Sequence, residues 1–494
     1  MKSSSSSANS PDNMRDANSP GTIQQAMFED IETKEVFERV REYGYNYLDN
    51  IMDRNVYPTE DALRNLSIFE EDFPVDPTAA TQVIHQLNKY GAPATVAQSG
   101  GRYFGFVCGG AVPAGVAAKQ LATIWDQNTA MAVLSPISAK LETIVEGWLK
   151  DLFHLPSNTV AGFVSGTSVA NFLGLAAARW RILARYNWDI NAKGLAGAPT
   201  IRIVAGKQAH AAVHKAIALL GLGTDNIEWA ETDGEGRIIP EKLPVLDDRT
   251  ILILQAGNVN SGSFDPFEEL CEKANAANAW VHIDGAFGLW AAASDVLQHL
   301  TRGIEKASSW AVDGHKTLNT PYDCGIILCN DKEALTAALH ASGSYLVVNK
   351  ETRDGMFYTP EMSRRSRIIE LWATMKYLGR SGISQMVHTL HERAVQFAVM
   401  LSMTKEFTVL NDVVFNQVLV CCETDELTAK TLARIQELRE CWVGGSVWKG
   451  RKVIRISVCS WATTEEDIVR SAQSFAQALQ EVLKPVPKKK TQAV

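Results

Sequence analysis

The middle of the chain, residues 99–384, alternates short apolar runs with longer amphipathic stretches. Short runs rich in apolar residues predict six buried strands: Ala161–Val164, Ile201–Val204, Ile251–Leu254, Trp280–Ile283, Ser309–Val312 and Gly325–Leu328. Apolar positions three and four residues apart predict three helices: Lys140–Asp151, Val169–Arg185 and His210–Leu220. Strands that alternate with helices favour an α/β fold with a doubly wound, mainly parallel sheet.

The flanking segments have other patterns. Residues 27–98 are helical in pattern but broken by prolines, which predicts an N-terminal helical arm without a core of its own. Residues 385–484 predict a small C-terminal α+β domain that starts with a helix from Met386 to Lys405. We expect a disordered leader at residues 1–26 and a solvated basic tail at 485–494, with the large domain at 99–384.

Composition narrows the classes of protein. Apolar residues make up 46% of the chain, charged residues 21%, and the net charge is −8, so nucleic acid is not an expected partner. No apolar run is long enough to cross a membrane, and the N-terminus lacks a secretory signal. Eight cysteines without a Cys-x-x-Cys motif predict reduced thiols, a cytoplasmic location and no metal site.

Small polar residues follow the first predicted strand. Ligands of open α/β sheets bind beyond the carboxyl ends of the strands, so residues at these positions are candidate site residues. Gly166, Thr167 and Ser168 open the next helix, where free N–H groups and the helix dipole favour a phosphate. Ser and Thr also cap helices without any ligand, so this motif alone leaves both interpretations open.

A carboxylate and an amine follow two later strands. Asp284 ends a strand before Gly285 and Ala286, where it could face a ring or simply cap a turn. Lys316, preceded by His315, follows the strand that ends near Val312. A lysine is rarely buried without a partner, and a desolvated amine can form a Schiff base; otherwise its stem lies on apolar surface and its amine reaches water.

Two more candidates lie at the same edge of the predicted sheet. His210 could stack on a flat ring, although single histidines are more often structural, and Asn258 belongs to an amide-bearing segment after Leu254. A phosphate cradle, an imidazole, a carboxylate and an amine are together the groups that pyridoxal 5′-phosphate (PLP) requires.

These motifs resemble one known family. The segments Asp284–Ala286, Asp313–Lys316 and Asn319–Gly325 are similar to those of the group II PLP-dependent amino-acid decarboxylases, which act on aromatic amino acids, glutamate or histidine. The resemblance runs from about residue 30 to residue 483 and implies a fold-type-I PLP enzyme. It implies that Lys316 forms the Schiff base with PLP and that Asp284 pairs with the ring nitrogen.

The resemblance implies further roles. His210 would stack on the ring and Ala286 would pack on its other face, while Gly166, Thr167, Ser168 and His315 would lie near the phosphate. Tyr345, on a loop after Lys316, would reprotonate the α-carbon. Tyr358 on the same loop is a rival, and His210 is a second possible relay. Asp313 stands where many animal members have Asn, and the small residues near 128–134 disfavour an aromatic substrate.

The expected activity is decarboxylation of an L-amino acid to its amine and CO₂ in a homodimer whose sites lie at the subunit interface. The alternatives are other PLP chemistry, namely an aminotransferase, a carbon–sulfur lyase or an aldehyde synthase, or a non-catalytic protein on a decayed enzyme fold. Arg455 bears on the first alternative, since transaminases of this type use an arginine of the small domain to bind the α-carboxylate. A structural ion pair is the simpler expectation for Arg455.

Overall fold

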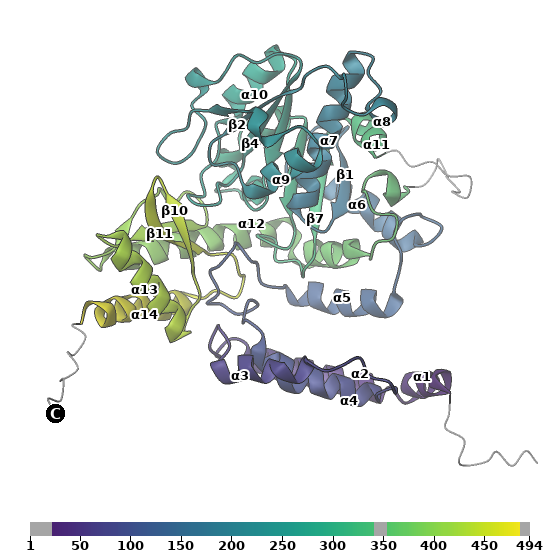
Figure 1. Ribbon diagram of the computed structural model, residues 1–494, viewed down its shortest axis with the longest axis vertical. Coiled ribbons are helices and arrows are strands. Elements are labelled where there is room, and N and C mark those ends of the chain that lie inside the picture. The colour runs from purple at the N-terminus through teal and green to yellow at the C-terminus, as the bar shows by residue number, and fades with distance from the viewer. Residues whose placement is uncertain (1–21, 340–352, 485–494) are drawn as a thin grey trace, which may run out of the picture. The chain divides into compact units, whose positions relative to one another are not determined.

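The computed structural model describes residues 22–339 and 353–484 (Figure 1). Its internal contacts divide the chain into two compact units, residues 1–51 with 58–95, and residues 52–57 with 96–494. The first unit holds most of the predicted arm, and the second holds the predicted large and small domains together. The boundaries expected at residues 384 and 484 stay predictions.

The first unit is a set of helices: α1 (Ile23–Thr33), α2 (Glu35–Asn50), α3 (Glu60–Arg64) and α4 (Ala80–Gln86). Helix α1 begins inside the segment expected to be a disordered leader. The Thr22 hydroxyl accepts a hydrogen bond from the Gln25 backbone N–H at 3.3 Å, and the Gln25 side chain accepts one from the Thr22 N–H at 2.8 Å. This reciprocal cap fixes the helix start earlier than apolar spacing alone indicates.

Seven strands form the large sheet: β1 (Val160–Val164), β2 (Arg202–Gly206), β3 (Ile227–Ala230), β4 (Thr250–Gln255), β5 (Trp280–Asp284), β6 (Ser309–Asp313) and β7 (Gly325–Cys329). Their order is β1-β7-β6-β5-β4-β2-β3, and only β7 runs antiparallel to its neighbours. The predicted α/β fold with a mainly parallel sheet is confirmed. All six predicted strands occur, and β3 is the strand that the pattern missed.

Helices cover both faces of this sheet: α5 (Pro113–Trp125), α6 (Pro136–Leu152), α7 (Thr167–Arg185), α8 (Ile190–Lys193), α9 (Ala211–Leu219), α10 (Phe267–Ala276) and α11 (Lys332–Ala338). Strand β4 shows how the faces divide. Leu252 and Leu254 belong to the core cluster that includes α6 and α10, whereas Ile251 and Ile253 belong to the cluster that includes α7 and α9. Side chains that alternate between two covered faces explain why these strands read as continuous apolar runs.

The C-terminal part is an antiparallel sheet with helices. Its strands are β8 (Thr408–Val409), β9 (Gln417–Cys421), β10 (Gly444–Trp448) and β11 (Arg451–Ser457), in the order β10-β11-β9-β8. Helices α13 (Asp425–Leu438) and α14 (Glu465–Leu483) pack on this sheet. The long helix α12 (Arg367–Ser402) contacts both this part and helices α5 and α6 of the large domain (Figure 1).

No helix within residues 22–339 and 353–484 combines the length and the apolar character that a bilayer crossing needs. The basic tail with Lys488–Lys490 falls outside the described residues.

Candidate active site

A cavity of about 270 Å³ lies at the carboxyl ends of strands β2, β4, β5 and β6, where an open α/β sheet binds its ligands. Four of the predicted site residues line it: His210, Asp284, Ala286 and Lys316. The remaining lining comes from Phe106, Val107, Gln255, Gly257, Val259, Phe287, Gly445 and Arg455. The large sheet, the β10–β11 hairpin and the segment near Phe106 therefore build one site.

Lys316 is held in the turn after β6. Its Nζ lies 3.0 Å from the Asp313 Oδ2. Burial lowers the pKa of Lys316, but the nearby carboxylates of Asp313 and Asp284 outweigh it and leave that pKa above its usual value. The Asn319 side chain fixes the turn, because its Nδ2 donates to the carbonyls of Lys316, Thr317 and Cys459 at 2.8–3.2 Å. Asn319 thus fixes the backbone at Lys316, and the amine itself lies against the Asp313 carboxylate.

Asp284 is the last residue of β5 and is 5% exposed. Its Oδ1 accepts a hydrogen bond from the Ala286 N–H at 3.2 Å, and its Oδ2 accepts one from the Asn171 Nδ2 at 3.1 Å. Two donors on the protein side leave lone pairs that can face the cavity. A carboxylate held this way could accept a hydrogen bond from a protonated ring nitrogen.

His210 is the N-cap of α9, and its Nδ1 accepts a hydrogen bond from the Ala212 N–H at 3.1 Å. The neutral ring therefore carries its proton on Nε2. Surrounding protein atoms lower the pKa of His210, a shift that Asp284 opposes and that Lys316 and Arg455 reinforce. His210 lines the cavity with a neutral imidazole, which is suited to stacking on a flat ring or to donating its Nε2 proton.

The start of α7 is linked to Lys316 through the Asp313 carboxylate, which contacts both Thr167 and the Lys316 amine. Thr167 donates from its N–H to the Asp313 Oδ1 at 2.7 Å and from its hydroxyl to the Oδ2 at 2.9 Å. Both donors of Thr167 are therefore already in use, while Ser168 is exposed. Gly325 must lack a side chain here, because a Cβ would lie 2.3 Å from the Gly166 Cα.

His315 borders the same region. Its Nδ1 accepts a hydrogen bond from the Cys324 N–H at 3.0 Å, and its Nε2 lies 3.6 Å from the Asp313 Oδ2. Its ring stacks on Tyr322 with centroids 4.4 Å apart. Burial lowers the pKa of His315, so the ring is neutral and carries its proton on Nε2.

Arg455 was expected to form a structural ion pair, and that expectation is wrong within the described residues. Its Nη1 donates to the Val259 carbonyl at 3.2 Å, and no described acidic side chain pairs with it. Burial lowers the pKa of this guanidinium, although a guanidinium remains charged at any physiological pH. A partly buried cation that lines the cavity is a ready site for an anionic group.

Two other candidates lie elsewhere. Asn258 is buried but does not line the cavity; its Oδ1 accepts from the N–H groups of Asn260 and Ser261 at 2.9 and 3.3 Å and so shapes a turn. Tyr345 falls within residues 340–352, outside the described residues. Its rival Tyr358 is 8% exposed and belongs to the core, with the Arg353 guanidinium 4.0 Å above its ring. Such burial disfavours a role for Tyr358 at the cavity.

Sequence reasoning missed several contributors. Phe106 and Val107 line the cavity with positive φ angles of 52° and 57°, a conformation that a β-branched residue rarely adopts and that clusters at functional sites. Phe106 stacks on Trp442 with centroids 5.3 Å apart. Asn171, which contacts Asp284, is a polar residue among the apolar positions of α7, and that contrast was a usable signal.

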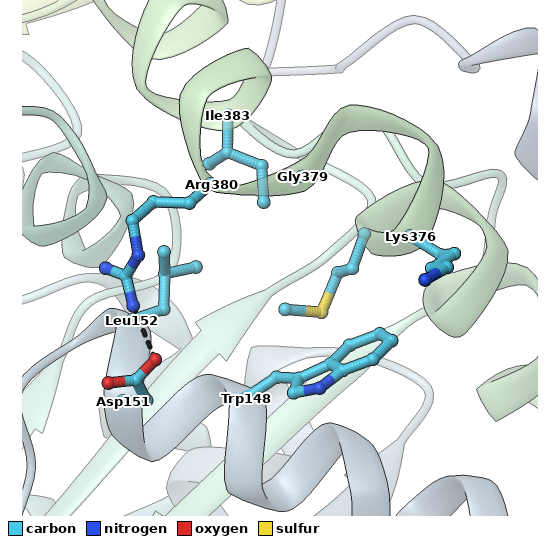
Figure 2. Close-up of a pocket in the computed structure, with 8 residues that line it drawn as sticks. Trp148, Asp151, Leu152, Lys376, Gly379, Arg380 and Ile383 are labelled. Atoms are coloured by element: carbon cyan, nitrogen blue, oxygen red, sulfur yellow. Dashed lines mark hydrogen bonds and ion pairs between the residues drawn. The ribbon is translucent and has the colours of Figure 1, made fainter.

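A second cavity of about 280 Å³ lies apart from these residues, between α6 and α12 (Figure 2). Trp148 and Leu152 line one side, and Arg380 forms an ion pair with Asp151 across its edge. This cavity includes none of the predicted site residues.

The residues of the first cavity fit PLP. Lys316 would provide the amine for the aldehyde, Asp284 a carboxylate for the ring nitrogen, and His210 and Ala286 the surfaces for the flat ring. The predicted phosphate residues Gly166, Thr167, Ser168 and His315 do not line this cavity, so their role stays a prediction.

Comparisons with known proteins agree with this site. The family model "Pyridoxal-dependent decarboxylase conserved domain" matches residues 63–423. The chain is 26% identical over 475 residues to an aromatic-L-amino-acid decarboxylase of Bacillus atrophaeus, covering 90% of this chain and 96% of the relative. It is 32% identical over 239 residues to an acidic amino acid decarboxylase of Mus musculus, covering 46% of this chain and 43% of the relative.

The fold has counterparts among solved structures. The crystal structure of Oryza sativa TDC with PLP and tryptamine superposes with a TM-score of 0.83 at 21% identity, covering 92% of this chain and 99% of that one. The predicted cofactor, PLP, and the predicted reaction class are confirmed by the family match. Since the family model matches well over half of the sequence, the chain belongs to the pyridoxal-dependent decarboxylase family and is a PLP-dependent amino-acid decarboxylase.

Proposed function

We propose that the chain converts an L-amino acid to its amine and CO₂ with Lys316 as the residue that holds the cofactor. The observation that carries this proposal is the meeting of Lys316, Asp284, His210 and Arg455 around one cavity. When bound, PLP supplies an electron sink for the charge left at the α-carbon. Asp284 holds the ring-nitrogen proton, and His210 supports the ring face with a neutral imidazole.

Arg455 is the proposed anchor for a carboxylate of the substrate. It lines the cavity, it has no acidic partner among the described side chains, and its fixed charge attracts an anion in a partly desolvated site. An anchored carboxylate fixes the orientation of the amino acid relative to Lys316, which is how an enzyme selects the bond that breaks.

The proton that replaces CO₂ needs a donor. We assign it to Tyr345 on the resemblance to the family, with the Nε2 proton of His210 as the alternative source inside the cavity. The burial of Tyr358 under Arg353 supports Tyr345 over its rival.

The first test traps the cofactor and identifies the products. Borohydride treatment of the loaded enzyme should fix the label on the peptide that contains Lys316, and Lys316→Ala should take up none. An amino-acid panel of acidic, aromatic and sulfur-containing substrates should yield amine and CO₂ in equal amounts. A stoichiometric keto acid or aldehyde in place of the amine would overturn the proposed reaction.

A pair of phenylalanine variants tests the proton donor. Tyr345→Phe should lower amine formation at least tenfold and divert product toward aldehyde, because relatives that make aldehydes tend to carry Phe at the matching position. Tyr358→Phe should keep the parent's product ratio. A diversion caused by Tyr358→Phe alone would reverse the assignment.

The homodimer is also a proposal. Helices α1 and α2 have no buried residue, and large apolar side chains such as Phe28 and Phe37 are more than half exposed. A surface of this kind is typical of an interface. Sedimentation should give twice the 54.2 kDa chain mass. Phe28→Glu should weaken the dimer, whereas Thr33→Glu, which adds the same charge on the polar side of α1, should leave it intact; a fully active monomer would contradict the proposal.

A reducing compartment such as the cytoplasm fits the cysteines. All eight are unpaired, and seven of them are buried.

A further inference from the structure

Behind Asp284, a row of buried polar side chains runs along one face of β5. Trp280, His282 and Asp284 alternate on this strand, so all three point to the same face of the sheet. The Asn171 side chain bridges two of them, with its Nδ2 3.1 Å from the Asp284 Oδ2 and its Oδ1 2.9 Å from the His282 Nε2. The Ser309 hydroxyl continues the row, at 2.8 Å from the His282 Nδ1 and 3.0 Å from the Trp280 Nε1.

Every member of this row behind Asp284 is enclosed. Asn171, His282 and Ser309 are fully buried, and Trp280 is 3% exposed. The fold also reserves space for the imidazole, because a Cβ on Gly174 of α7 would lie 2.5 Å from the His282 ring. Four polar side chains in a dry layer between sheet and helix are costly unless each is paired, and here each of the four has a hydrogen-bond partner.

The two ends of the row fix the direction of every hydrogen bond. The Trp280 indole can only donate, and the Asp284 carboxylate accepts from both of its protein partners, the Ala286 N–H and the Asn171 Nδ2. Asn171 must therefore turn its amide N–H groups toward Asp284 and its carbonyl toward His282. That carbonyl needs a donor, so His282 carries its proton on Nε2, and its bare Nδ1 accepts from the Ser309 hydroxyl. All four bonds point toward the carboxylate.

The middle of the row does not titrate in the working range. Burial lowers the pKa of His282 to about 3, so the imidazole is neutral near neutral pH. Because the ring stays neutral, its proton stays on Nε2, and every hydrogen bond of the row keeps its direction.

We propose that Asn171 and His282 are positioning residues that hold the Asp284 carboxylate aimed at the ring nitrogen of the cofactor, through a hydrogen-bond relay anchored at Ser309 and Trp280. The inference rests on the proposed pairing of Asp284 with that nitrogen. Asn171 acts directly on the carboxylate, and His282 acts through Asn171. Neither residue lines the cavity, so their effect on the cofactor passes through Asp284.

The test compares cofactor affinities for two ligands. PLP and its 1-deaza analogue, in which CH replaces the ring nitrogen, are titrated into the apo full-length chain, and binding is followed by quenching of tryptophan fluorescence. Asn171→Leu, of similar size but unable to donate, should raise the Kd for PLP about tenfold. It should leave the Kd for the deaza analogue unchanged. Equal losses for both ligands would mean a purely structural role and would overturn the proposal.

A double-mutant cycle separates the relay from the proposed function. If Asn171 acts through Asp284, Asn171→Leu has no further effect on PLP affinity once Asp284→Ala is present. Should Asp284→Ala raise the Kd for PLP and for the deaza analogue equally, the proposed pairing itself is wrong. Should Asp284→Ala raise the Kd for PLP alone while Asn171→Leu does not, the pairing stands and the relay is wrong.

Two further measurements guard against variants that do not fold. Ile251→Val is the matched control in the same buried layer: it removes one methyl group from a fully buried side chain that belongs to no hydrogen bond of the row, and PLP affinity should not change. In the unmodified holoenzyme, ¹⁵N resonances assigned by loss in His282→Gln should show a protonated Nε2 and a bare Nδ1 from pH 5.5 to 8. The opposite tautomer would refute the directed relay.

Discussion

Arg455 lines the cavity with a positive charge, and we expect it to bind a carboxylate of the substrate. Its carbonyl contact at Val259 uses one N–H of the guanidinium, so the others can bind a carboxylate in the cavity. Removing the charge leaves substrate orientation to weaker contacts. Arg455→Met should raise KM for the preferred amino acid at least tenfold with a smaller change in kcat. The KM of Arg455→Lys should lie between that of the parent and that of Arg455→Met.

A second arginine on the same strand provides the control. Arg451 is exposed and donates to the carbonyls of Cys422 and Glu423, away from the cavity. Arg451→Met should leave KM unchanged. An unchanged KM in Arg455→Met as well would show that this cation does not bind the substrate.

At the residue scale, sequence reasoning reached the groups that follow strand ends. Lys316, Asp284 and His210 were predictable because the carboxyl ends of parallel strands share one edge of the sheet. A polar residue among apolar positions marks Asn171, and its place in the small domain marks Arg455, but their contacts span 113 and 196 residues of chain, and no local pattern identifies such partners.

Helix α12 is interrupted at a single residue. Gly379, which is labelled in Figure 2, has φ 61° and ψ 178°, a conformation that is almost confined to glycine, and apart from its neighbours in the chain nothing would lie within 4 Å of a Cβ there. Gly379→Ala is therefore unfavourable for backbone reasons alone, and we expect a loss of about 1–3 kcal/mol in the free energy of unfolding. Thermal unfolding of the apo protein measures it.

A neighbouring glycine gives the opposite expectation. Gly382 lies in the regular part of α12, and its Cβ would meet only the Leu378 side chain, at 3.4 Å. Gly382→Ala should be neutral or should stabilise the helix by up to about 1 kcal/mol. If both variants unfold at the temperature of the parent, the break at Gly379 is not a backbone constraint.

The same break explains why part of α12 was missed at the element scale. The sequence predicted a helix from Met386 to Lys405, whereas α12 begins at Arg367. The turn at Gly379 shifts the phase of the apolar positions, so the two halves do not read as one periodic pattern. Strands β3 and β10 were missed for a different reason: both lie at sheet edges and are only partly buried, so neither forms a continuous apolar run.

At the scale of the whole molecule, buried titratable groups set the response of stability to acid. The pKa of His282 is about 3 in the folded chain against an ordinary 6.5, so between these values only the unfolded chain holds the proton. Acid therefore favours unfolding through this group, by about 2 kcal/mol between pH 6.5 and pH 5. Burial raises the pKa of Asp265 to about 6, so in the same range this carboxyl binds its proton in the folded chain first and opposes the loss.

These opposite signs give a paired prediction. Comparing the free energy of unfolding at pH 7 and pH 5, His282→Phe should lose less stability on acidification than the parent, because it lacks the imidazole that only the unfolded chain protonates. Asp265→Asn should lose more than the parent, because it lacks the compensating carboxyl. His210 and His315, whose pKa values are also lowered, contribute equally to all three proteins and cancel in the differences. Parallel losses in all three would mean that neither buried group controls the acid response, and the neutral state assigned to His282 would fall with it.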